Sequence, residues 1–400
     1  MKNQRHLRMF AVVMLLILFS GFISGCWDSR ELNQLGISSG ASFDIDPETG
    51  DALMTYQTII PSKVKSSTSG SSGEQTGGEI SPAVMLYHTR GATWIEALGN
   101  YYTHGDRIQF YPDDKLNIFG KELAKQGLYS PIQAIVRFPE TRPNSLVLIA
   151  QDKASDILAA QDGIETIQGM GIAREIKLSA EFSNYPGVTV IEFANRLMSK
   201  TTAPIAPILS IFEDTGMEGK KSKKAGISGT AVFKRDKMVG ELNKQESRGL
   251  LWAINKIKKG IVLVDAPDGS GKASLSISQA KSKIQPELID GKITITIEIE
   301  EEGNLTEYNG FQNLSDSLLK QLEERQNEKI KSDIMAAIEK SITLNADIFG
   351  FGEAVHRKYK KDWPDLEARW EEIYPSIDVV IKVKTHVNEN GDITKAVIPQ

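Results

Sequence analysis

The chain contains 400 residues, carries a formal net charge of −5 and has a single cysteine. Its length is enough for two or three domains. The acidic balance disfavours binding to nucleic acid and broad adhesion to anionic lipid. One cysteine excludes an internal disulfide, so the fold must rest on its apolar cores.

The N-terminus has the layout of an export signal. Three basic residues precede an apolar run from Met9 to Phe22, which is short for a transmembrane helix and leads into small residues. The next residues, Ile23-Ser24-Gly25-Cys26, resemble a lipobox, in which the cysteine thiol receives a diacylglycerol and becomes the first mature residue. Two acyl chains suffice for stable anchoring. We therefore expect 1–25 to be a cleaved lipoprotein signal peptide; the alternative is a signal anchor with a chance cysteine.

The first part of the mature chain predicts a hairpin followed by a loop. Two β-prone runs, Leu35 to Ile45 and Ala52 to Ile60, flank a Pro/Gly turn. Ser66 to Gly78 is almost entirely Ser, Thr and Gly, with too little apolar surface to offset the entropy of ordering. We expect 62–80 to be a flexible loop, acting as a spacer rather than a functional lid.

Strand-like and helix-like runs then alternate, which predicts a mixed or parallel sheet covered by helices. The predicted strands are 83–88, 115–119 and 145–150, and the predicted helices are 93–101, 121–126, 132–138, 154–160 and 188–199. In the last helix, a buried face is predicted from the helical spacing of Val188, Ile191, Ala194 or Asn195, and Met198. We assign 26–200 to an N-terminal α/β domain. The Pro-rich and then Gly/Lys-rich segment 201–225 is predicted to be a hinge or a small middle segment.

The remaining segment, 226–400, predicts an α+β domain with an antiparallel sheet and long helices. Its predicted strands are 230–234, 237–241, 261–265, 273–277, 293–299 and 377–387, with a helix over 245–256. Asn313 and Asp316 have capping-box spacing before a second helix, whose apolar residues predict a core-facing seam rather than a groove for a partner helix. Asn390-Gly391 is predicted to turn the chain into a last short strand.

Three stretches resemble the Ger(x)C family, the lipoprotein C subunit of nutrient germinant receptors in spore-forming bacteria. They are Cys26-Trp27-Asp28-Ser29-Arg30-Glu31-Leu32-Asn33, the segment 229–252, and Ala346-Asp347-Ile348-Phe349-Gly350-Phe351-Gly352-Glu353. The resemblance implies a lipid-anchored protein on the outer face of the cell membrane or the spore inner membrane. It also implies a multipass A subunit and a transporter-like B subunit as partners. The implied role is to help assemble that receptor or to transmit nutrient binding.

The residues directly after the anchor are our candidate for contact with a membrane partner. Trp27, Asp28, Arg30, Glu31 and Asn33 combine an aromatic ring, both charge signs and an amide close to the bilayer. An aromatic side chain can lie there at head-group level. The alternative is that these residues pack against the protein's own first domain.

Catalytic motifs are incomplete. Gly36-Ile37-Ser38-Ser39-Gly40 has the spacing of a nucleophile elbow, but a β-prone run follows where that motif needs a helix. Gly269-Ser270-Gly271-Lys272 resembles part of a phosphate loop, but a strand follows it, so we predict a β-turn. The five histidines form no close pair, and Glu300-Glu301-Glu302 is predicted to be a solvated strand tip.

We therefore predict a non-enzymatic protein with no catalytic residue, metal or cofactor. Two alternatives from other classes are a solute-binding lipoprotein of a transporter and a lipoprotein hydrolase of the cell wall. The first needs a two-lobed fold, and the second needs an acid/base or zinc site. The identity of a nutrient, and whether this chain binds it directly, do not follow from the sequence.

Overall fold

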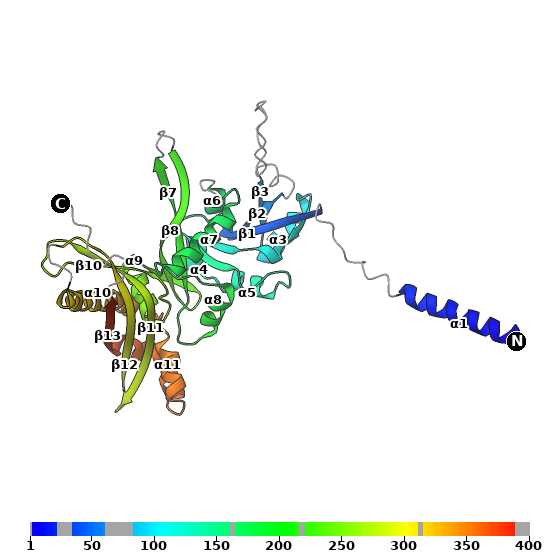
Figure 1. Cartoon of the computed structure of the whole chain (residues 1–400). Coiled ribbons are helices and arrows are strands. Elements are labelled where there is room, and N and C mark those ends of the chain that lie inside the picture. The colour runs from blue at the N-terminus through cyan, green and yellow to red at the C-terminus, as the bar shows by residue number, and fades with distance from the viewer. Residues whose placement is uncertain are drawn as a thin grey trace.

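Two β-sheets organise the chain (Figure 1). The structure is a computed structural model that describes residues 2–21, 34–60, 83–160, 165–215, 221–310 and 315–388. The larger sheet has nine strands: β1 (Leu35–Ile45), β2 (Ala52–Ile59), β3 (Val84–Gly91), β4 (Ile108–Phe110), β5 (Leu116–Gly120), β6 (Leu146–Ala150), β7 (Ile205–Thr215), β8 (Lys221–Lys234) and β9 (Lys237–Leu242). The smaller sheet has four: β10 (Gly260–Asp265), β11 (Lys272–Ile289), β12 (Lys292–Tyr308) and β13 (Asp378–Asn388).

The larger sheet is mixed, as predicted. Its order is β3-β2-β1-β5-β6-β7-β8-β9, and β4 pairs with the start of β1. The middle strands β1, β5, β6 and β7 are parallel, and antiparallel strands flank them. The central strands β5 and β6 are buried throughout because helices cover both faces. These helices are α3 (Trp94–Asn100), α4 (Lys121–Gln126), α5 (Tyr129–Arg137), α6 (Ala154–Ala159), α7 (Gln168–Glu181) and α8 (Val190–Met198).

Three features of this half differ from the sequence prediction. Helix α7 was not predicted, although Ile172 and Ile176 have helical spacing and are buried. Of the face predicted for α8, Val188 and Ala194 are buried, but Ile191 and Met198 are exposed, and the helix also buries Val190 and Phe193. Much of the predicted hinge is a hairpin, because β7 pairs with β8 from Ile205 out to Thr215. Backbone pairing holds this hairpin together in its outer part, where Glu213, Lys223 and Lys224 are exposed.

Residues 226–242 belong to the larger sheet. Strand β8 pairs with β7 and β9 pairs with β8, so both extend the nine-stranded sheet. The smaller sheet therefore begins only at β10. One apolar cluster contains residues of both sheets, from Phe43 on β1 to Ile297 on β12, so the two halves share a core.

The smaller sheet combines antiparallel and parallel pairing. Strands β10, β11 and β12 are antiparallel, as predicted, but β13 lies parallel to β12. Helices connect the end of β12 to the start of β13. They bring the chain back to the end of the sheet at which β12 begins, so the two strands run parallel. The helices of this half are α9 (Lys244–Ala253), α10 (Asp316–Thr343), α11 (Phe351–Lys358), α12 (Trp363–Ala368) and α13 (Trp370–Ile373).

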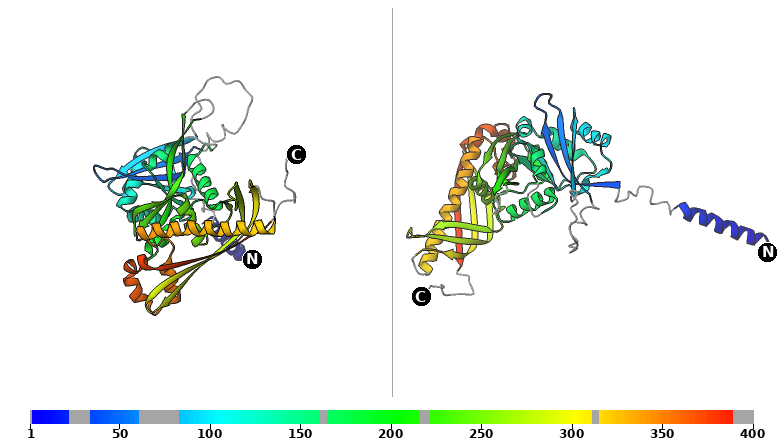
Figure 2. Two further views of the ribbon diagram at one scale, coloured as in Figure 1. Left: turned by 90° about the vertical axis from the view of Figure 1, so that its left-hand side faces the viewer. Right: turned by 90° about the horizontal axis from the view of Figure 1, so that it is seen from above.

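The long helix α10 packs on the smaller sheet and against α9 (Figure 2). Its buried residues include Leu322, Ile330 and Ile334, which confirms the predicted core-facing seam. A Cβ on Gly249 of α9 would overlap the backbone oxygen of Asp333, so this close approach requires glycine. The helix is capped by Ser315, whose hydroxyl accepts the Leu318 N–H, and not by the predicted Asn313, which lies outside the described residues.

Helix α1 (Lys2–Gly21) lies apart from both sheets (Figure 1). Within the described residues, no helix is both long and apolar enough to cross a membrane. The predicted lipidation site Cys26, the predicted loop 62–80 and the predicted turn at Asn390-Gly391 fall in 22–33, 61–82 and 389–400. These ranges lie outside the described residues.

Candidate functional site

The residues predicted to contact a membrane partner are not placed by the structure. Trp27, Asp28, Arg30, Glu31 and Asn33 fall in 22–33, as Cys26 does, outside the described residues. The chain is described again from Gln34, immediately before β1. The start of β1 lies at the side of the larger sheet that faces away from the smaller sheet (Figures 1 and 2).

The start of β1 is held by the segment around β4. Leu35 and Ile37 pair with Ile108 and Phe110 in parallel. The Arg107 side chain donates from Nη1 to the Leu35 carbonyl at 3.3 Å. These contacts hold the start of β1 in place. Strand β1 is the first described strand after residue 33, and β4 lies beside its first residues.

The motif 346–353 builds a buried junction between the two halves. The Asp347 carboxylate is 3% exposed and caps α11. Its Oδ1 accepts the N–H groups of Gly350 at 2.8 Å and Phe351 at 3.0 Å, and its Oδ2 accepts that of Gly352 at 2.8 Å. Gly350 has a φ of +76°, which glycine adopts without a steric penalty. The carboxylate thus satisfies three N–H groups that the start of a helix leaves without intrahelical partners.

The N-terminal half supplies the other side of this junction. Arg196 on α8 donates from Nη1 to the carbonyls of Ala203 at 2.9 Å and Ile348 at 3.0 Å. The Ala203 N–H donates to the Asp347 carbonyl at 2.8 Å, and Thr202 forms a parallel bridge with Asp347. The segment before β7 is therefore hydrogen bonded, through backbone and side chain, to the segment before α11.

Two contacts on the rim extend the junction. Ser199 donates from its hydroxyl to Glu353 Oε1 at 2.9 Å, and Lys200 pairs with Glu367 at 2.7 Å. The Lys200 pair is exposed and contributes little stability by itself. The buried contacts of Asp347 and Arg196 are therefore the main polar link between the halves.

At this junction, burial favours the neutral forms of Asp347 and Arg196, whereas their opposite charges favour the ionised forms. Burial raises the pKa of Asp347 to about 6, although three backbone N–H groups and Arg196 favour its ionised form. Burial also lowers the pKa of Arg196, which the nearby Asp347 opposes. Each group stabilises the charge of the other, so loss of one leaves the other unfavourably buried.

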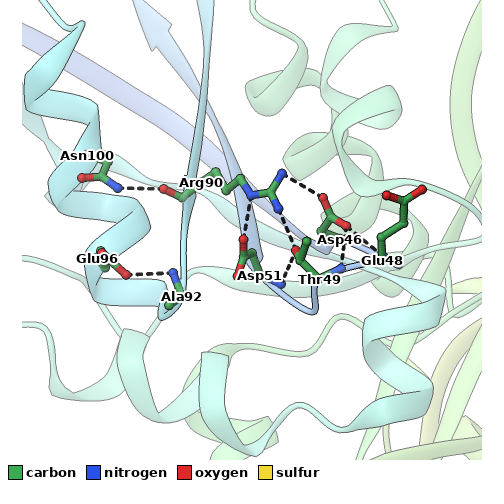
Figure 3. A network of polar contacts seen from close by, with 8 residues as sticks. All are labelled: Asp46, Glu48, Thr49, Asp51, Arg90, Ala92, Glu96 and Asn100. Carbon is green, nitrogen blue, oxygen red and sulfur yellow. Dashed lines mark hydrogen bonds and ion pairs between the residues drawn. The ribbon is translucent and has the colours of Figure 1, made fainter.

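A second polar network lies at the turn between β1 and β2 (Figure 3). Arg90 on β3 pairs with Asp46 at 3.0 Å and Asp51 at 2.7 Å, and also donates to the Thr49 hydroxyl at 2.7 Å. Asp46 Oδ1 accepts the N–H groups of Glu48 and Thr49. Because these groups satisfy each other around an exposed turn, the network fixes the shape of the hairpin and offers no free chemical group.

The structure explains why two catalytic motifs fail. Ser38, which occupies the nucleophile position of the motif, is fully buried within β1, and this strand continues to Ile45. A nucleophile elbow would require a sharp turn into a helix at this point. The predicted turn near Gly269 is confirmed: its N–H donates to the Ala266 carbonyl at 2.9 Å, and β11 starts at Lys272.

Histidines do not gather into a metal site in the described part of the chain. His356 stacks on Trp363 with ring centroids 5.0 Å apart, and His88 hydrogen bonds the Thr55 hydroxyl at 2.9 Å. Among the residues that the structure describes, no group of three or more His, Cys, Asp or Glu side chains is arranged to hold a metal ion.

The prediction for the three glutamates was wrong for Glu301. This residue lies in the middle of β12, is 2% exposed, and accepts a hydrogen bond from Gln326 Nε2 of α10 at 2.9 Å. Burial raises the pKa of Glu301 to about 8. Position 301 continues the inward alternation of Ile297 and Ile299, which is the sequence signal that identifies it as buried.

Two family models match this chain. The model described as "Spore germination protein N-terminal domain" matches residues 28–211. The model described as "Spore germination B3/ GerAC like, C-terminal" matches residues 228–391. Together they include four of the five predicted partner-contact residues, all but Trp27, as well as most of the larger sheet and the motif at the junction.

Curated relatives match over almost their full length. The chain is 26% identical to spore germination protein KC of Bacillus subtilis (strain 168), with 96% of each chain covered. It is 24% identical to spore germination protein B3 of the same organism, with 96% of this chain and 98% of that protein covered. The crystal structure of the GerBC protein has the same fold, with a TM-score of 0.53, 19% identity, and 90% of this chain and 99% of that chain covered.

Proposed function

Since the chain belongs to the family of GerAC-like spore germination proteins, we propose that it is a lipid-anchored subunit of a spore germinant receptor. The observation that carries this proposal is the match of both halves, 28–211 and 228–391, to models of spore germination proteins. A match confined to one half would leave open a different protein with a borrowed domain. In this proposal the subunit helps two membrane subunits assemble or transmits their response to a nutrient.

Cys26 anchors the protein in the proposed account, on the outer face of the cell membrane or the spore inner membrane. The stretch from Cys26 to Leu35 spans at most about 30 Å when fully extended. The start of β1, with β4 beside it, therefore lies close to the membrane surface. The smaller sheet lies on the far side of the larger sheet from the start of β1 (Figure 1). In the proposed account it is therefore farther from the bilayer than β1 and β4.

The junction at Asp347 gives the two halves a common position relative to the anchor. It joins α8 and the start of β7 to α11 through buried hydrogen bonds. The apolar core that the two halves share also holds them together. A displacement of the membrane-near half would then carry the outer half with it, which suits a subunit that assembles or couples other subunits. No catalytic step is part of this proposal.

The contact proposed for Trp27 and Arg30 can be tested by replacing both with alanine. We expect lipidation and the melting temperature to remain unchanged, while co-purification with the two membrane subunits falls and the nutrient response of spores slows. The matched control replaces Tyr129 and Arg137 of α5, which are an aromatic and an arginine on an exposed surface, and should behave as wild type. Normal co-purification and nutrient response in the first double variant would refute the contact.

A further inference from the structure

Strand β10 is an outer strand of the smaller sheet (Figure 1). It carries apolar side chains on both faces. Val262 and Val264 are buried against the core, whereas Ile261 and Leu263 on the other face are 52% and 50% exposed. Within the described part of the chain, β11 is the only strand that pairs with β10. An exposed apolar edge strand readily pairs with another chain unless something protects it.

Other outer strands carry the charged groups that protect such edges. Strand β3 presents Arg90, and β13 presents Lys382 and Lys384. The β13 edge is also covered by α10, because Glu323 Oε1 accepts the Val387 N–H at 2.9 Å. Strand β10 has only apolar side chains between its first and last residues, so it lacks this protection.

The backbone of β10 directs polar groups along its outer edge. The Ala266 N–H donates to the Gly271 carbonyl at 2.8 Å, in the register that pairs Val264 with Ala273 and Val262 with Leu275. Hydrogen-bonded pairs alternate along an antiparallel ladder, so the residues between them direct their N–H and C=O groups away from β11. Ile261 and Leu263 therefore offer backbone donors and acceptors at the edge.

A groove runs beside this edge. One cavity of about 620 Å³ is lined by β10, by Lys244 and Arg248 of α9, and by Phe182 at the end of α7. A second cavity of about 700 Å³ shares Phe182 and Lys244 and continues along α7 past Leu178. Phe182 and Leu178 are about half exposed, so the groove has an apolar wall over much of its length.

Cationic side chains line the groove, and the buried donors of Arg248 lack hydrogen-bond partners among the described residues. The Nε and Nη2 atoms of Arg248 are buried and have no hydrogen-bond partner there. Asp333, the nearby carboxylate, is paired with Lys329 at 2.7 Å. Lys244 has no ion pair within the described chain. A guanidinium with free donors in a partly buried groove is complementary to a carboxylate.

We propose that β10 is the docking edge for an extended segment of a partner protein that carries an Asp or Glu side chain among apolar residues. The segment adds a strand beside β10 through the free groups of Ile261 and Leu263, its apolar residues cover Phe182 and the exposed face of β10, and its carboxylate binds Arg248. This mode of recognition combines backbone pairing for affinity with side-chain pockets for specificity. It goes beyond the receptor assignment and does not depend on it.

Two other occupants fit the groove less well. In a second copy of this chain paired edge to edge through β10, the carboxylate carried by that strand, Asp265, is already paired with Lys272 at 2.7 Å. The chain's own residues 389–400 have their acidic side chains, Glu389 and Asp392, within four residues of β13. Strand β13 lies three strands away from β10 in the smaller sheet. The segment after β13 would therefore have to cross about 14 Å of sheet to reach the outer edge of β10.

A random heptapeptide library selected on the immobilised full chain provides the test. We expect the recovered peptides to be enriched in alternating β-branched residues with one Asp or Glu. Arg248→Gln should weaken their binding about thirtyfold, the effect of removing one partner of a desolvated charge pair. Leu263→Lys should abolish binding by placing a charge on the edge. The matched control is Val380→Lys on β13, where an apolar side chain 44% exposed is replaced and binding should persist.

Four results would overturn the proposal. They are a library that yields no binding peptide, recovered peptides that bind the Arg248 and Leu263 variants as tightly as wild type, a dimer cross-linked through β10, and binding that appears only after removal of 389–400. The last two would assign the edge to a second copy or to the chain's own terminus. If the Leu263 variant is misfolded by circular dichroism, the Arg248 variant decides alone.

Discussion

Replacing Asp347 with alanine should destabilise the protein strongly, because two buried N–H groups and one half-buried N–H group lose their acceptor, and a buried guanidinium loses its counter-charge. The three amides donate to the carboxylate at 2.8, 3.0 and 2.8 Å. An unsatisfied buried donor costs about 1–3 kcal/mol, and removing one member of a buried charge pair costs about 3–5 kcal/mol. These effects overlap, and water relieves part of them. We expect a loss of about 4 kcal/mol in the free energy of unfolding.

Asp347→Asn separates the hydrogen bonds from the charge. The amide oxygen still accepts N–H groups at the start of α11, whereas the charge opposite Arg196 is lost. We expect a loss of about 2 kcal/mol for this variant, intermediate between wild type and alanine. Asp362→Ala is the control, because this exposed aspartate precedes α12 without capping it through its side chain. Its effect should stay within about 0.5 kcal/mol.

Urea denaturation measures these losses. Trp363 and Trp370 are buried near the junction and report its unfolding through their fluorescence. If Asp347→Ala unfolds within about 1 kcal/mol of wild type, the three amides find other partners and the carboxylate does not hold the halves together.

Three further changes have defined outcomes. Glu301 is protonated in the fold and ionised in the unfolded chain between pH 4.5 and about 8, so wild-type stability should fall as pH rises through this window, and Glu301→Gln should flatten that slope in urea titrations at several pH values. Cys26→Ala should leave an uncleaved precursor without diacylglycerol in mass spectra of the N-terminal peptide, whereas an unmodified wild type would contradict lipidation. Shortening 66–78 by several residues should change the melting temperature little, because closure entropy varies slowly with loop length; a large drop would show that this segment packs in the fold.

Elements with a simple periodicity could be predicted from the sequence. The Pro/Gly turn after Ile45 predicted the first hairpin at nearly its observed position, and the alternation over 293–299 predicted the first part of β12, which continues to Tyr308. The recurrence of apolar residues at mostly every fourth position along α10 predicted its buried face. In each case one face of the element is buried over much of its length, so the pattern of side chains follows the pattern of burial.

Features that depend on distant partners were missed. The outer part of the β7–β8 hairpin carries exposed charged residues, Glu213, Lys223 and Lys224, in place of an alternating apolar pattern, so only its backbone pairing identifies it as strand. The parallel pairing of β13 depends on the path of the helices between it and β12. Asp347 and Arg196 are adjacent only because α8 and α11 meet in the fold, and neither residue has a neighbour in sequence that indicates the other. Glu301 was misjudged because its neighbours at 300 and 302 are exposed.

The nutrient response of spores that lack this chain tests the receptor assignment most directly. Spores of a deletion strain, and of the same strain carrying the wild-type or the Cys26→Ala chain, would be exposed to nutrients and to a trigger that bypasses nutrient receptors. We predict that the deletion abolishes the response to at least one nutrient, that the wild-type chain restores it, and that the bypass response is unchanged. A normal response to every nutrient, or an equal defect in the bypass response, would contradict a role as a germinant receptor subunit.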